Sequence, residues 1–157
     1  MIDAYVLRSL VRRCNYNLIE INHFMSISQR VVFVDTDESL TGVKEFINTG
    51  LADISFIKYI NSANISQYPL EMIKELRRIC KTMLTHKPFE VITIHDSFAC
   101  SPVNCNQLRF HYNKILADMS ESTMIDDILN QLFWNVDTVK KGKSIADKIR
   151  QSNYGIC

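Results

Sequence analysis

The residues with the clearest chemical potential in this chain are His95 and Asp96, which directly follow the apolar run Val91-Ile92-Thr93-Ile94. A run this rich in β-branched residues predicts a strand inside a sheet, and a carboxylate at its end needs a partner. The partner could be a cation, the strand end itself, or a metal ion. Mg²⁺ takes one or two protein carboxylates and completes its coordination with water and phosphate oxygens. One Asp is therefore enough for half of a two-metal phosphoryl-transfer site.

A β-hairpin is the element expected to position these two residues. We expect a strand over residues 89–94, a sharp turn at 95–97 and a second short strand over 98–100. Tight hairpin turns normally recruit Gly or Asn because they need positive φ. This turn contains neither, so it should be strained or wider than two residues.

The rest of the sequence predicts a helix-rich α+β fold with a small antiparallel sheet. Hydrophobic periodicity and capping residues, including Gly50 as a C-cap and Thr123 with Asp126 as a capping box, set the expected elements. We expect helices up to Arg13, at 40–50, 54–60, 69–84, 101–119 and 123–133, and a short helix from Ser144, with further strands at 18–21 and 31–34.

Composition excludes several classes of protein. With 157 residues, 46% hydrophobic and 22% charged, the chain matches one globular domain rather than a disordered or fibrous protein. No apolar stretch is long enough to span a membrane, and the start lacks a signal-peptide pattern. Five scattered cysteines without a CxxC indicate free thiols of a reducing compartment, so we expect a cytoplasmic location and no membrane partner.

Charge distribution leaves two interpretations open. The formal net charge is +1, but basic blocks at 69–87 and 140–150 flank residues 115–139, which contain five acids and no Lys or Arg. Such blocks can be solvated faces or stripes that face phosphates.

The segment Ile94-His95-Asp96-Ser97-Phe98 resembles motif C of the single-subunit DNA-dependent RNA polymerases of phages and mitochondria. Further positions coincide with the family pattern, and residues 141–154 resemble the family's C-terminal end. The resemblance covers residues 89–121 and 141–157 and does not extend before about residue 65. The further coinciding positions are Pro102, Leu108, Asp118 and Glu121.

The resemblance implies a role for each matching residue. Asp96 would bind both catalytic Mg²⁺ ions on a palm hairpin, and His95 would contact the 3′-terminal region of the transcript. The C-terminal tail, with Tyr154 and the free carboxylate of Cys157, would lie near the site. Ser97 stands where related family-A DNA polymerases have Glu, which favours an RNA polymerase.

The helix at 69–84 precedes the motif and carries Arg77, Arg78 and Lys81. Its basic face could contact the nucleic-acid backbone or simply be solvated.

Two motifs of the family are missing from this sequence. Motif A supplies a second metal-binding Asp far upstream of motif C, and motif B grips the incoming nucleotide. Asp35-Thr36-Asp37 follows an apolar run as motif A does, but it lies only about sixty residues before Asp96, with no motif B between them; a strand-end turn is the alternative. A single Asp cannot clamp two mutually repelling ions, so we expect the chain alone to be inactive.

Because the chain begins with Met and ends like the family, we expect a split RNA polymerase. Larger subunits would supply motifs A and B, and the complex would act on a DNA template, an RNA transcript and nucleoside triphosphates in the host-cell cytoplasm. Residues 1–64 would form a fingers-side segment and 65–157 a palm segment. The alternatives are a part of a family-A-like DNA polymerase and a non-enzymatic, polymerase-derived interaction protein.

Overall fold

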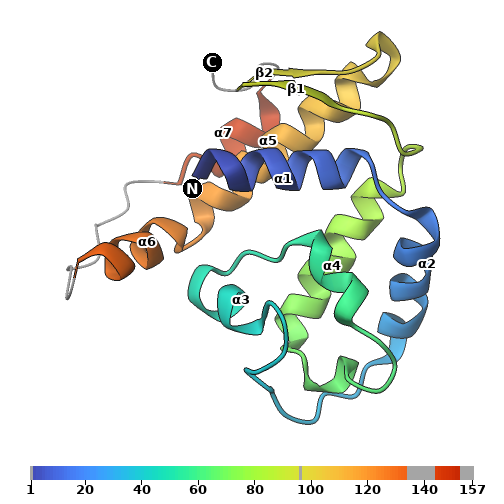
Figure 1. Cartoon of the computed structure of the whole chain (residues 1–157), viewed down its shortest axis with the longest axis vertical. Helices are drawn as coiled ribbons and strands as arrows, with labels where there is room; N and C mark the ends of the chain where they lie inside the picture. The colour runs from blue at the N-terminus through green and yellow to red at the C-terminus, as the bar shows by residue number, and fades with distance from the viewer. Residues whose placement is uncertain (1, 96, 134–143, 153–157) are drawn as a thin grey trace.

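The computed structural model describes residues 2–95, 97–133 and 144–152. Helices dominate, and the strands form one antiparallel pair, as the sequence predicts. Figure 1 shows the hairpin at one end of the molecule beside α1, α5 and α7, with α2, α3 and α4 in the other half. The α-helices are α1 (Ile2–Cys14), α2 (Leu18–Ile27), α3 (Val43–Thr49), α4 (Leu70–Met83), α5 (Cys105–Glu121), α6 (Met124–Leu132) and α7 (Ala146–Gln151), the strands are β1 (Ile92–Ile94) and β2 (Ser97–Ala99), and short 3-10 helices lie at Ser28–Arg30, Ile54–Tyr59, Ile65–Gln67 and Pro102–Asn104.

The strand predicted at 18–21 is wrong, because these residues begin helix α2. The Asn17 side chain accepts a hydrogen bond from the backbone N–H of Ile19 at 2.9 Å and caps the helix. Ile21 and Phe24, one turn apart, are its buried residues. A good cap and helical spacing therefore outweigh the β-branched composition.

The predicted strand at 31–34 is wrong: these residues form no strand in the described part of the chain, although Val31 itself is extended. The backbone N–H of Val34 donates a hydrogen bond to the carbonyl of Ser66 at 3.1 Å. Val32 is 81% exposed, so the apolar run is not buried as a strand of this composition usually is.

The helices predicted at the start of the chain, at 40–50 and at 69–84 are confirmed with shifted ends. Gly50 ends α3 at φ 72°, the left-handed conformation of a C-cap glycine. The predicted capping box at Thr123 is wrong, because its hydroxyl does not cap α6 and donates instead to Asn48 O at 2.7 Å.

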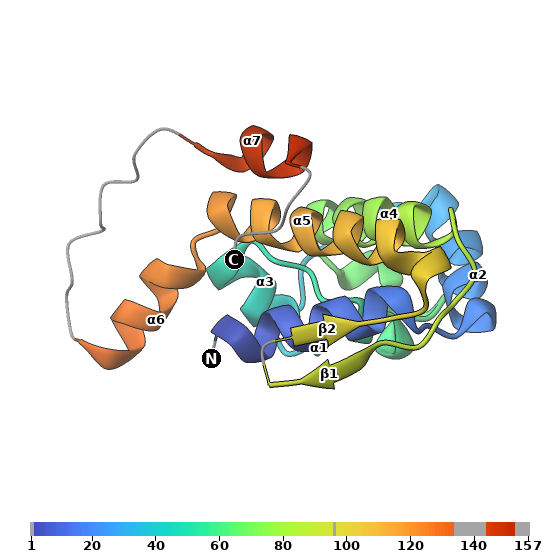
Figure 2. The ribbon, with the colours of Figure 1, turned by 90° about the horizontal axis from the view of Figure 1, so that it is seen from above.

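Two large hydrophobic clusters, and a small one that packs α7 on α5, hold the described part of the chain together. The larger one lies between α2, α4 and the segment 43–68, which contains α3 and two of the 3-10 helices, and Met72, Leu76 and Met83 are fully buried in it. The second joins α1, α5 and the base of the hairpin, around Leu10 and Ile115. Figure 2 shows α1 below α5 with the hairpin alongside. The hairpin therefore stands on a helical platform, not inside a larger sheet.

Candidate functional site

The hairpin tip is as tight as an antiparallel turn can be. Ile94 pairs with Ser97, so residues 95 and 96 alone connect the strands. His95 has φ 53°, a left-handed conformation that non-glycine residues adopt at a cost. Of the two predicted possibilities, strain is therefore confirmed and a wider turn is wrong. Strained residues of this kind concentrate at functional sites.

Asp96, the predicted metal ligand, lies outside the described residues, as do Tyr154 and Cys157. Its neighbours His95 and Ser97 are both exposed, so the tip faces solvent.

One face of the hairpin packs on the helices and the other does not. Phe98 lies 5.9 Å from Tyr112 of α5, centroid to centroid. Ile92 and Ile94 lie on the other face of β1 and are 60% and 64% exposed. The prediction that this apolar strand sits inside a sheet is thus wrong for this chain by itself, since β1 pairs only with β2 among the described residues.

An apolar pocket of about 370 Å³ lies beside the tip. It opens between the start of α1, the hairpin and α5. Among its described lining residues, Asp3 is the one acidic side chain, and none is Lys or Arg. The lining residues are Ile2, Asp3, Ala4, Val6, Leu7, His95, Phe98, Tyr112 and Leu116.

The predicted basic face of α4 divides into two kinds of residue. Arg77 donates to Met25 O at 3.1 Å and to Ser28 Oγ at 2.7 Å, which ties α4 to the end of α2. Arg78 binds Glu75 and Asp118. Lys81 is exposed. The two arginines therefore connect elements of the fold, while Lys81 faces solvent. Contact of these three residues with nucleic acid stays a prediction.

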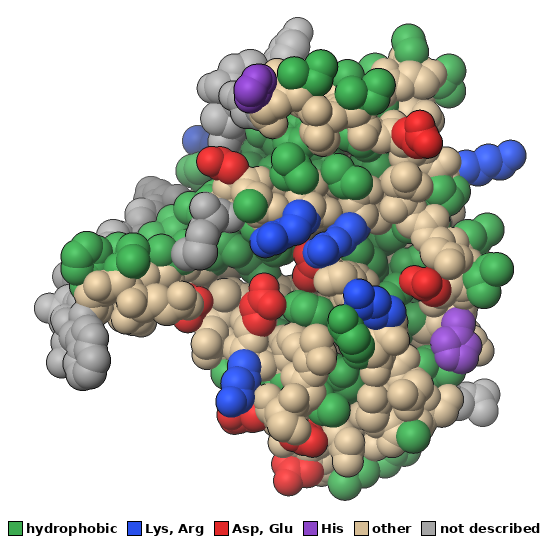
Figure 3. All heavy atoms as spheres, in the orientation of Figure 1, with side chains coloured by type: hydrophobic (Ala, Val, Ile, Leu, Met, Phe, Trp, Pro, Cys, Tyr) green, Lys and Arg blue, Asp and Glu red, His purple; other side chains and the backbone are tan. Residues whose placement is uncertain are grey.

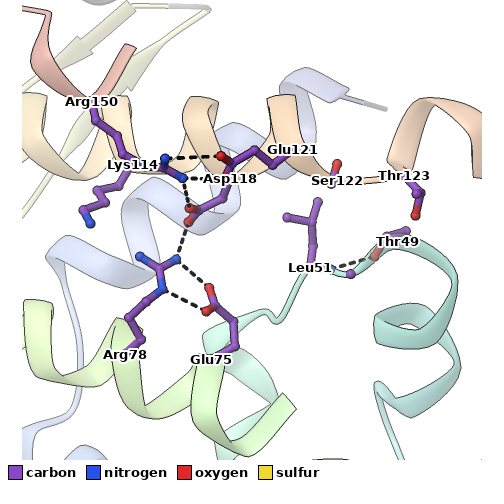
Figure 4. Close-up of a pocket in the computed structure, with 11 residues that line it drawn as sticks. Thr49, Leu51, Glu75, Arg78, Lys114, Asp118, Glu121, Ser122, Thr123 and Arg150 are labelled. Carbon is purple, nitrogen blue, oxygen red and sulfur yellow. Dashed lines mark hydrogen bonds and ion pairs between the residues drawn. The ribbon is translucent and has the colours of Figure 1, made fainter. Parts of the chain in front are cut away.

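Asp118 is the centre of a charge network that was not predicted from the sequence. Figure 4 shows Arg78 of α4 and Arg150 of α7 converging on it across a pocket of about 490 Å³. Its carboxylate lies 2.8 Å from Arg78, 3.7 Å from Arg13 and 3.8 Å from Arg150. The Asp118 and Arg13 side chains are 10% and 5% exposed. The network joins α1, α4, α5 and α7 at one point.

The cations of this network are held in their charged form by their partners. The hydrogen bond with Glu75, aided by Asp118, raises the pKa of Arg78 above its ordinary value. The pKa of Arg150 is raised chiefly by its hydrogen bond with Glu121. The Asp118 carboxylate is therefore paired with three guanidinium groups, and this pairing disfavours a role as a metal ligand.

Two histidines form a second buried polar contact. His86 Nε2 and His111 Nε2 are 2.7 Å apart, and His86 Nδ1 lies 2.8 Å from Lys87 O. A carbonyl can only accept, so neutral His86 carries its proton on Nδ1, and His111 must donate to its Nε2. Burial lowers the pKa of His111 to about 3. The pair links the segment after α4 to α5.

Asp35 and Asp37, the weaker candidates for a motif A, form a local turn. Asp37 accepts hydrogen bonds from Ser39 N at 2.8 Å and Ser39 Oγ at 2.6 Å. Asp35 accepts one from Thr36 N at 2.8 Å. Both carboxylates serve as turn acceptors, which favours the structural interpretation of this segment.

No group of three or more His, Cys, Asp or Glu side chains in the described residues is arranged to hold a metal ion. The described cysteines, Cys14, Cys80, Cys100 and Cys105, are free thiols, as predicted. Within the same residues, no helix combines the length and apolar character that crossing a bilayer requires.

Comparison with known proteins found no match: no protein-family model matches the chain, and no curated protein matches it.

Proposed function

We propose that this chain is the motif C subunit of a split single-subunit-type RNA polymerase. The observation that supports this most is the hairpin tip, where residues 95 and 96 form a two-residue turn strained at His95. That turn carries the sequence Ile94-His95-Asp96-Ser97-Phe98, which resembles the catalytic hairpin of these enzymes. Residues held at left-handed φ concentrate at functional sites, which favours a role for the His95 side chain.

In this proposal each residue of the tip has a distinct role. Asp96 and a carboxylate of the partner chain would hold Mg²⁺, which supplies electrostatic stabilisation of the phosphoryl group and activation of the attacking oxygen. His95, fixed by the turn and facing solvent, would bind the end of the transcript. Phe98 anchors the hairpin on Tyr112, so the tip has a rigid base.

The need for a partner chain has support from the exposed face of β1. Ile92 and Ile94 present apolar side chains to solvent, and hydrophobic side chains gather over the hairpin end of the molecule in Figure 3. Burial of this face by a partner palm would account for the strand's β-branched composition. The partner would bring motifs A and B, which the sequence lacks.

Reconstitution tests this function. The chain alone should add no nucleotides to a primer, whereas the chain purified with a polypeptide carrying motifs A and B should extend RNA with ribonucleotides and Mg²⁺. Extension with deoxyribonucleotides alone would indicate the DNA polymerase alternative. Nucleotide addition by the isolated chain, or none by any such complex, would contradict the proposal.

A further inference from the structure

Helix α6 leaves the body of the protein with its apolar side chains unburied. None of the residues from Met124 to Leu132 is buried, and Figures 1 and 2 show the helix projecting away from α5. Ile125, Leu132 and Phe133 are 55%, 65% and 59% exposed. Hydrophobic residues this exposed are ordinary when scattered, but here Ile125 and Leu132 share one short helix and Phe133 directly follows it.

The start of α6 is nevertheless fixed to the fold. Thr123 N donates to Thr49 O at 3.1 Å, and Thr123 Oγ1 donates to Asn48 O at 2.7 Å. A nine-residue helix has little stability of its own in water. The described residues therefore hold the start of α6 in place, with Met124 packed against the second cluster, but leave every apolar side chain of the helix at least partly exposed.

The spacing of the apolar residues is that of a helix that lies in a groove. Ile125, Ile128, Leu129 and Leu132 fall at i, i+3, i+4 and i+7, which places them on one face. This is the pattern by which amphipathic helices bind an apolar groove on another protein.

The charges on α6 decide what kind of surface it fits. Asp126 and Asp127 lie in its first turn, and no Lys or Arg occurs from residue 115 to 133. Anionic lipid and nucleic acid would both repel such a helix, and membrane-surface helices carry Lys and Arg on their polar face. A second copy of α6 would bring the same acids against each other.

We propose that α6 is a docking helix for an apolar groove, rimmed by Lys and Arg, on another protein. The apolar stripe fills the groove, and Asp126 and Asp127 pair with the basic rim. This surface is separate from the hairpin, and the proposal holds whether or not Asp96 is catalytic.

Photocrosslinking of the full chain in the cells that produce it tests the docking directly. p-Benzoylphenylalanine at Leu129 should crosslink to an apolar, Lys- or Arg-flanked segment of a different protein. The same probe at Asn130, on the polar side of the helix, should crosslink far less. Crosslinks from position 129 to another copy, to nucleic acid or to lipid, or none above the Asn130 control, would overturn the proposal.

A titration with the purified crosslinked protein then separates the two parts of the surface. Ile125→Ser combined with Leu132→Ser should weaken binding by about 30-fold or more, because anchors of an interface carry most of its affinity. Asp126→Asn with Asp127→Asn should weaken it less, and that effect should vanish at 1 M salt, where the screening length is only about 3 Å. Ile19→Ser on α2, at 80% exposure the matched apolar control, should change nothing.

Equal weakening by Ile19→Ser, or none by the Ile125 and Leu132 pair, would overturn the docking role. The melting temperature should stay unchanged in every variant, since none of these side chains is buried. A crosslinked partner without polymerase motifs would leave the docking role standing and count against the proposed polymerase complex, so the two proposals fail separately.

Discussion

Arg78 of α4 places a guanidinium nitrogen 2.8 Å from the carboxylate of Asp118 on α5, forty residues away along the chain. This contact bridges the two hydrophobic clusters, because α4 belongs to one and α5 to the other. Arg13 of α1 lies almost fully buried beside the same carboxylate. The two halves of the fold are thus joined by a partly buried ionic contact as well as by apolar packing.

Replacement of Asp118 by Asn should lower the free energy of unfolding by about 2–3 kcal/mol, because it leaves the buried Arg13 charge without its counter-ion. Chemical denaturation measures this. The matched control is Glu71→Gln, which breaks the exposed Glu71–Lys74 pair on the surface of α4 and should cost less than about 0.5 kcal/mol. Equal effects of the two substitutions would contradict a central role for Asp118.

Stability should fall as the pH drops below about 6.5. The folded-state pKa of His111 is lowered to about 3 by burial, with His86, Arg13 and Lys114 opposing a charge there as well. The unfolded-state pKa of His111 is about 6.5, so below that pH the unfolded chain binds a proton at His111 that the folded chain does not bind. The free energy of unfolding therefore falls as the pH drops to about 3. Between pH 7 and 5 this group should cost roughly 1–2 kcal/mol.

His111→Gln should flatten this part of the pH profile, while the exposed His23→Gln on α2 should leave it as it is. Denaturant midpoints measured from pH 8 to 4 decide the matter. A profile of the same steepness in His111→Gln and the native chain would show that another group is responsible.

Much of the fold follows from local patterns in the sequence. The apolar periodicity of α4 and α6 and the glycine after α3 give these helices directly. The segment at 18–21 was mispredicted because its Ile and Leu residues suit either element, and the Asn17 cap decides between them. Local pattern thus predicts helices well and short apolar runs poorly.

The buried polar contacts could not be predicted from local sequence patterns. Asp118 with Arg13 and His86 with His111 meet only through tertiary packing. One signal was present: Asp118 lies one turn from Ile115 on the apolar side of α5, where a carboxylate needs a partner. The sequence did locate the hairpin, but the absence of Gly at its turn left two possibilities, strain or a wider turn, and only the structure decides between them.

The cysteines should differ sharply in reactivity. Burial raises the pKa of Cys14 and of Cys80 to about 12, whereas Cys105 is exposed. Since the thiolate is the reactive form, iodoacetamide at pH 8 should modify Cys105 at least about 100-fold faster than either buried thiol. Peptide mass spectrometry over time measures the rates, and rapid modification of Cys14 in the native chain would contradict the described core.

Substitutions at His95 should separate strain from function. His95→Gly should be neutral or stabilise the chain by up to about 1 kcal/mol, because glycine adopts the left-handed φ without cost. His95→Val should destabilise it by about 1–2 kcal/mol, since a β-branched residue fits that φ worst. In the polymerase complex, however, both variants should lose activity, because each removes the imidazole; full activity in the glycine variant would assign His95 to the turn alone.

The central claim is that Asp96 completes a two-metal site contributed by two chains. The most direct measurement is nucleotide addition by the purified complex with Asp96→Asn, alongside Asp37→Asn, whose carboxylate serves a local turn. The Asp96→Asn complex should assemble normally but lose at least about 1000-fold in rate, because it lacks the metal-binding carboxylate, while the Asp37→Asn complex should retain full activity. An active Asp96→Asn complex would contradict the central claim.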